Sequence, residues 1–398
     1  MLFQPDANPR GLVPGWVHVE GGSILDVGFG SAPARADLGG DDSCIFPGFI
    51  DAHVHLPQFD SIGVAGLELL DWLNTVIFPA EMRWGDPGFA AAMAERATDE
   101  LISFGTTGFA GYGTVHAESV REAMVQVASR HVRAVFGPSL MDRNAPPELC
   151  RVASEQIEAL SGFSTIGRVE PAVTPRFAVA CSPELMTQAA ELARARGWAI
   201  QTHLAETRAE MALVASLFGG RPYAQVYDEC GLLTPRTIVA HGVYLDDAQR
   251  DLLRRRGSVL AHCPTANRFL RAGAMDRDAA QVRGVRLALG SDVAGGPDRS
   301  MVRVARAMVE TAWSVGHEAP SGVECFRAIT RGNAEALGWN ACGHIAPGFE
   351  ADLVVTRPTL GLAEHPDPLG GLLHAWDDRW IEQTIVGGVV EYDVRWRV

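Results

Sequence analysis

The stretch PGFIDAHVHLP, residues 47–57, ends an apolar run with two histidines, His53 and His55. In a β-strand, residues two apart point to the same side, so both imidazoles would face one direction. Phe49 and Val54 make the segment apolar on both faces, as in a strand buried within a parallel sheet. A polar pair on a solvent-exposed face fits that pattern poorly. Two histidines at the end of a buried strand are typical of metal ligands, so further ligands are expected elsewhere in the chain.

Three later apolar runs also end in side chains that can bind a metal or move a proton. AIQTHLAE contains His203 and Glu206, TIVAHGVYL contains His241, and VRLALGSDVAGG contains Asp292. Neutral imidazoles and a carboxylate suit a borderline divalent metal, with Zn²⁺ favoured and Fe²⁺ as the alternative. Such a metal lowers the pKa of bound water from about 15.7 toward about 7, which generates hydroxide at neutral pH.

The elements that must position these side chains alternate between strand-like and helix-like runs. Helical periodicity is found in PELMTQAAELARARG and DDAQRDLLRRRG, for example. The strand-like runs are FIDAHVH, GTTGFAGYGT, RAVFGPSL, RVEPAVTPRF, AIQTHLAE, TIVAHGVYL, SVLAHCPTAN and VRLALGSDVAGG. Eight strands with intervening helices over roughly 300 residues predict a (β/α)8 TIM-type barrel. An open doubly wound sheet is the alternative, but no GxGxxG motif follows an early strand.

Catalytic groups of such barrels lie at the C-terminal ends of the strands, so the four histidines and Asp292 are expected to converge. Asp292 is expected to bind the metal and accept a proton from the water. Glu206 is expected on the rim, free of the metal, where it can pass a proton to a ring nitrogen. Of the other histidines, His116 is a weaker candidate for the rim, and His262 is expected to form a hydrogen bond behind the ligands.

Both ends of the chain are rich in β-formers separated by glycine turns, as in WVHVEGG, SILDVG, DLVVTRP and QTIVGGVVEYDVRWRV. We therefore expect residues 1–46 and 345–398 to form one small β-sandwich domain. Residues 47–344 are expected to form the barrel with the metal site.

Composition excludes several classes of partner. The net charge of −14 argues against nucleic acid as a partner. No apolar run reaches the roughly 18 to 20 residues that span a membrane, and the N-terminus lacks the features of a signal peptide. Seven scattered cysteines form no CxxC motif, which favours reduced thiols in a cytoplasmic protein.

The motifs HVH, HLAE, AHG and SDVAGG, in this order, resemble the amidohydrolase superfamily. Over most of residues 45–310 the chain resembles its guanine deaminases in particular, through PGFIDAHVHLPQ, LLDWLNTVIFPAE, TPRFAVACS, QTHLAET, VYDECGLLTPRTIVAHGVYL, AHCPTAN and LALGSDVAGG. HLPQ followed by LLDWLNTVIFPAE is the most specific of these features. The resemblance implies hydrolytic deamination of guanine to xanthine and ammonia, a small-molecule purine substrate and a homodimer.

The resemblance also assigns roles to individual residues. The implied metal ligands are His53, His55, His203, His241 and Asp292. Glu206 would be the proton shuttle, and His241 would also help to polarise the attacked carbon. Gln58, Arg176, Phe177 and Glu206 would bind the base. The fork of donors on Arg176 suits carbonyl and ring-nitrogen acceptors, and Phe177 can stack on a planar purine.

Lysine is absent, so all 34 basic residues are arginine. Two-metal members of the superfamily usually bridge their metals with a carboxylated lysine on a central strand. A chain without lysine cannot form that bridge. We therefore expect one metal ion per chain.

The segment CPTANRFLRAGAMD departs from the family, with Arg268 and Arg271 where apolar or small residues are expected. Two cations near the pocket would shift preference toward a more oxidised or larger ring. The alternative substrates are 8-oxoguanine, a pterin or an ammeline-like triazine. Trp72 and Phe78 are expected to pack a helix against the barrel, and the alternative is that the loop around them covers the site.

Two other functional classes are less compatible with the sequence. A non-catalytic binding protein would have no reason to keep every ligand and the shuttle carboxylate. Cytidine-deaminase-type enzymes need H-x-E with a later P-C-x-x-C, and no PCxxC occurs here.

Overall fold

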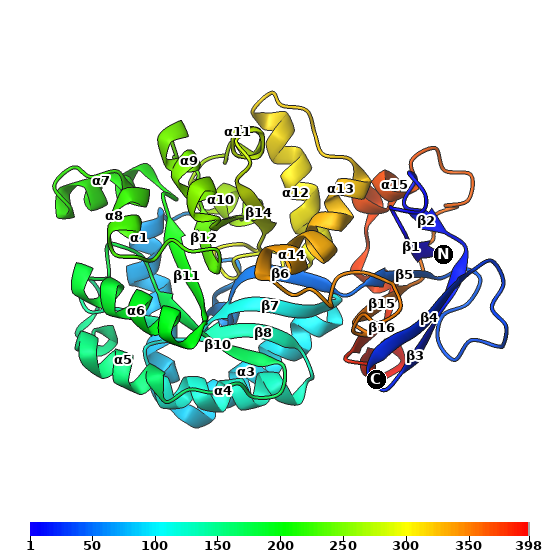
Figure 1. The fold of residues 1–398 in the computed structure, drawn as a ribbon, viewed down its shortest axis with the longest axis horizontal. Helices are drawn as coiled ribbons and strands as arrows, with labels where there is room; N and C mark the ends of the chain where they lie inside the picture. Colours follow the sequence, from blue (N-terminus) through cyan, green and yellow to red (C-terminus); the bar gives the residue numbers. More distant parts are fainter. Residues whose placement is uncertain (397–398) are drawn as a thin grey trace.

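The computed structural model describes residues 1–396, so the last two residues of the predicted C-terminal segment lie outside the described part. Eight parallel strands form the barrel in the order β14-β13-β12-β11-β10-β8-β7-β6 (Figure 1). Their bounds are β6 Phe49–His55, β7 Thr106–Tyr112, β8 Arg133–Gly137, β10 Val169–Pro175, β11 Ala199–Leu204, β12 Thr237–His241, β13 Val259–His262 and β14 Arg286–Leu289. A two-residue strand, β9 (Ser139–Leu140), extends the pairing of β10. The predicted barrel is confirmed.

Helices follow most barrel strands and cover the outside of the barrel (Figure 1). Their bounds are α3 Pro87–Ser103, α4 Ala117–Ser129, α5 Ala153–Ser161, α6 Pro183–Arg196, α7 Arg208–Leu217, α8 Tyr223–Glu229, α9 Asp247–Arg256, α10 Pro264–Phe269, α11 Arg277–Val282, α12 Met301–Ser314, α13 Gly322–Arg327, α14 Asn333–Leu337 and α15 Pro368–Ala375. The two helices quoted from the sequence are α6 and α9. Ser182 caps the start of α6, and Gly197 ends it in the left-handed conformation. Among the described residues, no helix is long and apolar enough to cross a membrane.

The barrel closes between its first strand and the segment that follows its last. Asp292 N donates to His53 O at 2.8 Å, and His55 N donates to Val293 O at 3.1 Å. A Cβ at Gly290 would lie only 2.6 Å from the Cβ of His53, so this close approach requires glycine. Closure therefore brings Asp292 next to the two histidines of β6.

Side chains also hold together this seam, the junction between β6 and β14 with the residues that follow β14. Asn333 at the start of α14 donates to Ile50 O at 2.6 Å and to Leu289 O at 2.8 Å, and its Oδ1 accepts from Leu289 N at 2.8 Å. Ser291 N donates to Asp51 Oδ1 at 2.9 Å. All of these residues are buried, so the hydrogen bonds join β6 to β14 without help from solvent.

Strands from both ends of the chain form a separate small sheet, as predicted. Its order is β17 (Val389–Asp393), β16 (Ile381–Val386), β15 (Leu353–Thr356), β5 (Cys44–Pro47), β1 (Leu2–Phe3) and β2 (Leu12–Val13). A second pair, β3 (Gly15–Glu20) and β4 (Ser23–Phe29), lies beside it on the right in Figure 1. The exact residue limits of the two domains stay a prediction.

An ion-pair network connects this sheet to the barrel. Arg133 Nε donates to Glu350 Oε2 at 3.1 Å, and Arg168 Nη1 donates to Asp352 Oδ1 at 2.9 Å. Arg168 also contacts Glu350. Cys342, Glu350 and Asp352 lie close enough together to hold a cation, but the two guanidinium groups already neutralise both carboxylates. The cluster is therefore structural.

This network predicts acid sensitivity. Burial alone would raise the pKa of Glu350, but its hydrogen bond from Arg133 and the charge of Arg168 lower that pKa from 4.5 to about 2. The stabilisation is complete above pH 4.5 and is lost as pH falls from 4.5 toward 2. We expect Glu350→Gln to remove on the order of 2 kcal/mol of the pH-dependent unfolding free energy between pH 7 and pH 3. Urea unfolding at pH 7 and pH 3 measures it.

The matched control is Glu335→Gln. Glu335 pairs with Arg331 on the surface, with its side chain 63% exposed. This variant should show the same pH dependence as the parent protein. If the unfolding free energy of the Glu350→Gln variant depended on pH as that of the parent protein does, Glu350 would not be the source of the acid sensitivity.

Candidate metal and substrate site

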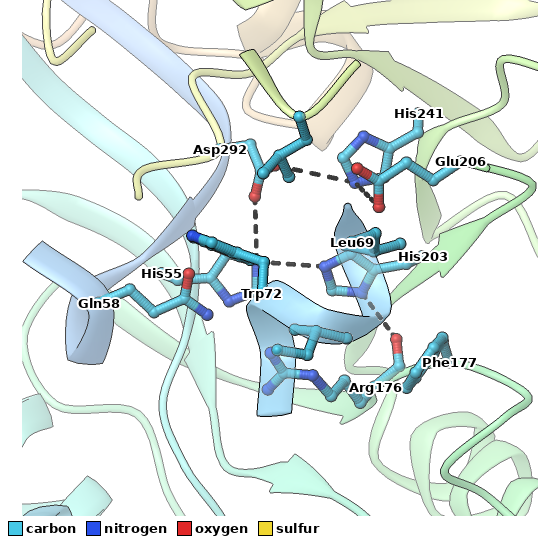
Figure 2. Close-up of a pocket in the computed structure, with 12 residues that line it drawn as sticks. His55, Gln58, Leu69, Trp72, Arg176, Phe177, His203, Glu206, His241 and Asp292 are labelled. Carbon is cyan, nitrogen blue, oxygen red and sulfur yellow. Dashed lines mark hydrogen bonds and ion pairs between the residues drawn. The ribbon is translucent and has the colours of Figure 1, made fainter. Parts of the chain in front are cut away.

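The structure brings the five predicted metal ligands together at the C-terminal end of the barrel. Nε2 of His55 lies 3.2 Å from Nε2 of His53 and 3.1 Å from Nε2 of His203. Asp292 Oδ1 lies 3.2 Å from Nε2 of His53 and 3.3 Å from Nε2 of His55. His241 Nε2 lies 3.9 Å from Asp292 Oδ2. Figure 2 shows four of these side chains pointing toward one another.

The geometry and chemistry of these donors fit a divalent cation. One ligand atom from each of His53, His203, His241 and Asp292 lies within 4.8 Å of the others. His55 falls outside that group of four but contacts three of its members. Separations of 3.1 to 3.3 Å are those of donors that each lie about 2.1 Å from a shared ion.

The protonation of the imidazoles agrees with this fit. Burial lowers the pKa of His55 to about 3 and that of His203 well below its ordinary value, so both rings are neutral. His203 Nδ1 donates to Arg176 O at 2.7 Å, and His241 Nδ1 donates to Asn267 Oδ1 at 2.9 Å. Each bond leaves Nε2 with a free lone pair. Within the described part of the chain, the buried His241 Nε2 has no hydrogen-bond partner, as expected of a metal ligand.

Asn267 in α10 is a residue whose role the sequence analysis missed. The sequence analysis expected a hydrogen bond behind the ligands from His262, but the buried Nδ1 of His262 has no hydrogen-bond partner among the described residues. Asn267 makes the bond because α10 begins directly after β13 and points this amide toward His241. The AHCPTAN motif contained the residue, but only the fold shows its partner.

Asn267→Ala is expected to weaken metal binding about 10- to 100-fold, because His241 loses the acceptor that fixes its tautomer. Titration of metal-free protein with Zn²⁺ measures the change. Asn144→Ala is the control, since its amide donates to Val179 O away from the cluster. Equal Zn²⁺ affinity in the Asn267 and Asn144 variants would contradict this role.

Two buried carboxyl groups beside the cluster have opposite pKa shifts. Burial, followed by the negative charge of Asp292, raises the pKa of Glu206 well above its ordinary value. Burial would also raise the pKa of Asp292, but hydrogen bonds from His53 and His55 outweigh it and hold that pKa well below its ordinary value. Glu206 Oε2 lies 3.5 Å from His241 Nε2. One acid and one base therefore lie next to each other.

Local structure fixes the position of Glu206. It lies two residues after the end of β11, and its backbone N–H donates to Glu210 Oε2 at 2.7 Å. Thr207 and Glu210 form a capping box at the start of α7. The turn between strand and helix therefore holds Glu206 at the rim, where the sequence placed it.

A pocket of about 370 Å³, including the open space at its mouth, lies beside the ligands. Its lining residues are His55, Gln58, Leu69, Trp72, Leu73, Arg176, Phe177, His203, Glu206, His241, Leu270 and Asp292. All four predicted substrate-binding residues, Gln58, Arg176, Phe177 and Glu206, are among them. Figure 2 shows Glu206, His241 and Asp292 on one side of the pocket and Arg176 with Phe177 on the other.

The insertion after β6 supplies an apolar wall of the pocket. It contains a 3-10 turn (Leu56–Ser61), α1 (Leu69–Trp72), a π-helical turn (Leu73–Ile77) and α2 (Phe78–Met82). Trp72 was expected to pack a helix against the barrel, with a covering role for its loop as the alternative, and its buried side chain lines the pocket.

Two other expectations about position are corrected. Arg268 and Arg271 line a separate cavity of about 650 Å³, and Arg268 pairs with Glu310 at 2.6 Å. Leu270, between them on the helical turn, is the residue that faces the site pocket. His116 hydrogen-bonds Thr114 and lines another cavity, so it does not reach the site.

A parallel barrel with imidazoles and a carboxylate at the C-terminal ends of its strands is the arrangement of metal-dependent hydrolases. Residues 44–390 match the amidohydrolase family. Guanine deaminase of Escherichia coli (strain K12) is 34% identical over 367 residues, which cover 88% of this chain and 83% of the relative. The chain therefore belongs to the amidohydrolase family, among its guanine deaminases.

Solved structures agree with this assignment. Guanine deaminase from C. acetobutylicum, with guanine bound in its active site, has a TM-score of 0.88 at 26% identity and covers 95% of this chain and 94% of that one. An adenosine deaminase from Xanthomonas campestris with bound zinc has a TM-score of 0.84 at 26% identity, covering 95% of this chain and 88% of that one.

Proposed function

We propose that this protein hydrolyses guanine to xanthine and ammonia. The observation that carries the proposal is the pocket itself: a cluster of imidazoles and Asp292 on one side, and a cation and an aromatic ring on the other. The first side suits attack by water, and the second suits recognition of a planar heterocycle. The relatives named guanine deaminase support guanine as that heterocycle.

Recognition is assigned to three residues across the pocket from Glu206. Phe177 offers a ring face for stacking on the purine. Arg176 and Gln58 provide N–H groups for its carbonyl and ring-nitrogen acceptors. This orientation turns the amino-bearing edge of guanine toward Glu206 and Asp292.

A divalent cation held by the four histidines and Asp292 would lower the pKa of a water molecule toward about 7. As the water oxygen bonds to C2, Asp292 accepts a proton from it and Glu206 donates its own proton to N3. His241 helps to polarise C2. The tetrahedral carbon then carries a hydroxyl and an amino group.

The same two carboxyl groups complete the reaction. Asp292 returns its proton to the amino nitrogen as the carbon–nitrogen bond breaks and ammonia leaves. Glu206 takes the hydroxyl proton, which gives the C2 carbonyl of xanthine. Both carboxyl groups end in the protonation states in which they began.

We further propose one Zn²⁺ per chain, with Fe²⁺ as the alternative, in a cytoplasmic homodimer. The donor set and the zinc-bound relative support zinc. The absence of lysine supports a single ion.

The test is ammonia release by purified protein of measured metal content. Guanine is compared with 8-oxoguanine, ammeline, a pterin, adenine and cytosine. Strong turnover of guanine with about one metal per chain is the expected result. Activity on another ring alone would support deamination as the reaction but would assign it to a substrate other than guanine. No ammonia from any ring, despite bound metal, would overturn deamination.

A further inference from the structure

Glu81 in α2 is a buried carboxylate that the proposed mechanism does not use. It is fully buried and is not among the residues that line the pocket. Its side chain contacts the two polar residues to which recognition is assigned. Arg176 Nη1 donates to both of its oxygens at 2.7 Å, and Gln58 Nε2 donates to Oε1 at 3.0 Å.

We propose that Glu81 is a positioning residue that sets which ring edge the pocket accepts, by fixing Arg176 and Gln58 with their free N–H groups toward the substrate. The proposal rests on the proposed function, and it names the substrate class of that site. The class is a heterocycle with adjacent acceptors, a carbonyl oxygen and an unprotonated ring nitrogen, on the edge opposite the amino group.

The hydrogen bonds of Gln58 show how its amide is oriented. An amide can be turned so that either its oxygen or its nitrogen faces a given neighbour. The carboxylate of Glu81 only accepts, so it requires the nitrogen of Gln58, and Ala294 N donates to Oε1 of Gln58 at 3.4 Å. One N–H of this amide remains for the substrate.

Arg176 is held in the same way. Its guanidinium has five N–H donors in a rigid fork, and Glu81 takes two of them at Nη1. No other acceptor within the described part of the chain binds this side chain, so the N–H groups of Nη2 and Nε remain available to the substrate. The side chains of Arg176 and Glu81 are 4% and 1% exposed, so rotation of the fork would leave a buried charge without its partner.

The donor pattern distinguishes two of the candidate rings. Guanine has O6 and an unprotonated N7 on the edge opposite its reacting side, and both accept hydrogen bonds. In 8-oxoguanine, N7 carries a hydrogen and would face a donor. A buried donor left unpaired disfavours that ring, and discrimination of this kind is worth about 10- to 100-fold.

The experiment compares the parent protein with Glu81→Gln in kcat, KM and metal content, using guanine and 8-oxoguanine. A glutamine at this position can present its amide nitrogen to Gln58, which frees that amide to turn. We expect KM for guanine to rise at least about tenfold and the guanine preference in kcat/KM to fall by about tenfold, with kcat changed little and metal content unchanged.

The matched control is Asp352→Asn, which removes another buried carboxylate partner of an arginine, Arg168, far from the pocket. It should lower Tm and leave KM and the ring preference unchanged. Glu81→Asp keeps the charge but retracts the carboxylate by one methylene. It provides the same comparison if Glu81→Gln does not fold.

A double variant identifies the route of the effect. Because Glu81 acts through both Arg176 and Gln58, adding Glu81→Gln to Arg176→Met should change KM and ring preference by a smaller factor than Glu81→Gln does in the parent protein. Lower Tm with unchanged KM and ring preference in both Glu81 variants would overturn the inference and leave guanine deamination standing. A metal-loaded parent protein that is inactive on guanine would instead overturn the proposed function, and this inference with it.

Discussion

Glu206→Gln is expected to lower kcat for guanine by about 10²- to 10⁴-fold, the range for loss of a general acid–base group. The amide keeps the size of the side chain but cannot exchange a proton with N3. Glu206 lies beside His241 and is not one of the four residues that group as metal ligands, so metal content should stay at the parent level. Initial rates of ammonia release and metal analysis of the same sample measure both effects.

Glu191→Gln is the control for this variant, because Glu191 is exposed on α6. It should retain the parent kcat. A Glu206→Gln protein with more than about a tenth of the parent kcat would remove Glu206 from the proton transfers.

Asn333→Ala is expected to lower the free energy of unfolding by on the order of 3 kcal/mol. The substitution leaves three buried backbone groups of Ile50 and Leu289 without the side-chain partner that now joins β6 to β14. Urea unfolding at neutral pH measures the loss.

Asn74→Ala is the comparison for stability, since Asn74 donates to Leu70 O on an exposed surface. We expect that change to stay within about 0.5 kcal/mol. Similar unfolding free energies for the two variants would show that Asn333 does not hold the seam. Because Asp292 follows this seam, a loosened barrel should also bind Zn²⁺ less tightly.

The sequence by itself determined the barrel and the chemical type of the site. Apolar runs of strand length, separated by periodic helices, predict parallel strands, because a strand that is buried on both faces is apolar along its length. The ends of parallel strands meet at one end of a barrel. For that reason His53, His203, His241 and Asp292 could be grouped from their places at strand ends, before any contact was known.

Only the tertiary structure decided which side chains meet across the fold. Glu81 and Arg176 are 95 residues apart, and no periodicity indicates that they form a pair. Asn267, and not His262, supports His241 because of the direction in which α10 leaves β13. Leu270 faces the pocket while Arg268 and Arg271 turn away, a difference set by their rotation about one short helical turn.

The physical reason is the range over which each kind of interaction is encoded. The burial pattern of a strand, and the burial and hydrogen bonding of a helix, follow from neighbours in sequence, so a pattern of residue types is sufficient to predict these elements. A hydrogen bond between segments forms only when its angle is favourable and its donor–acceptor distance is correct to within a few tenths of an ångström. Those are fixed only when the whole barrel closes, as it does at Gly290 and Asn333.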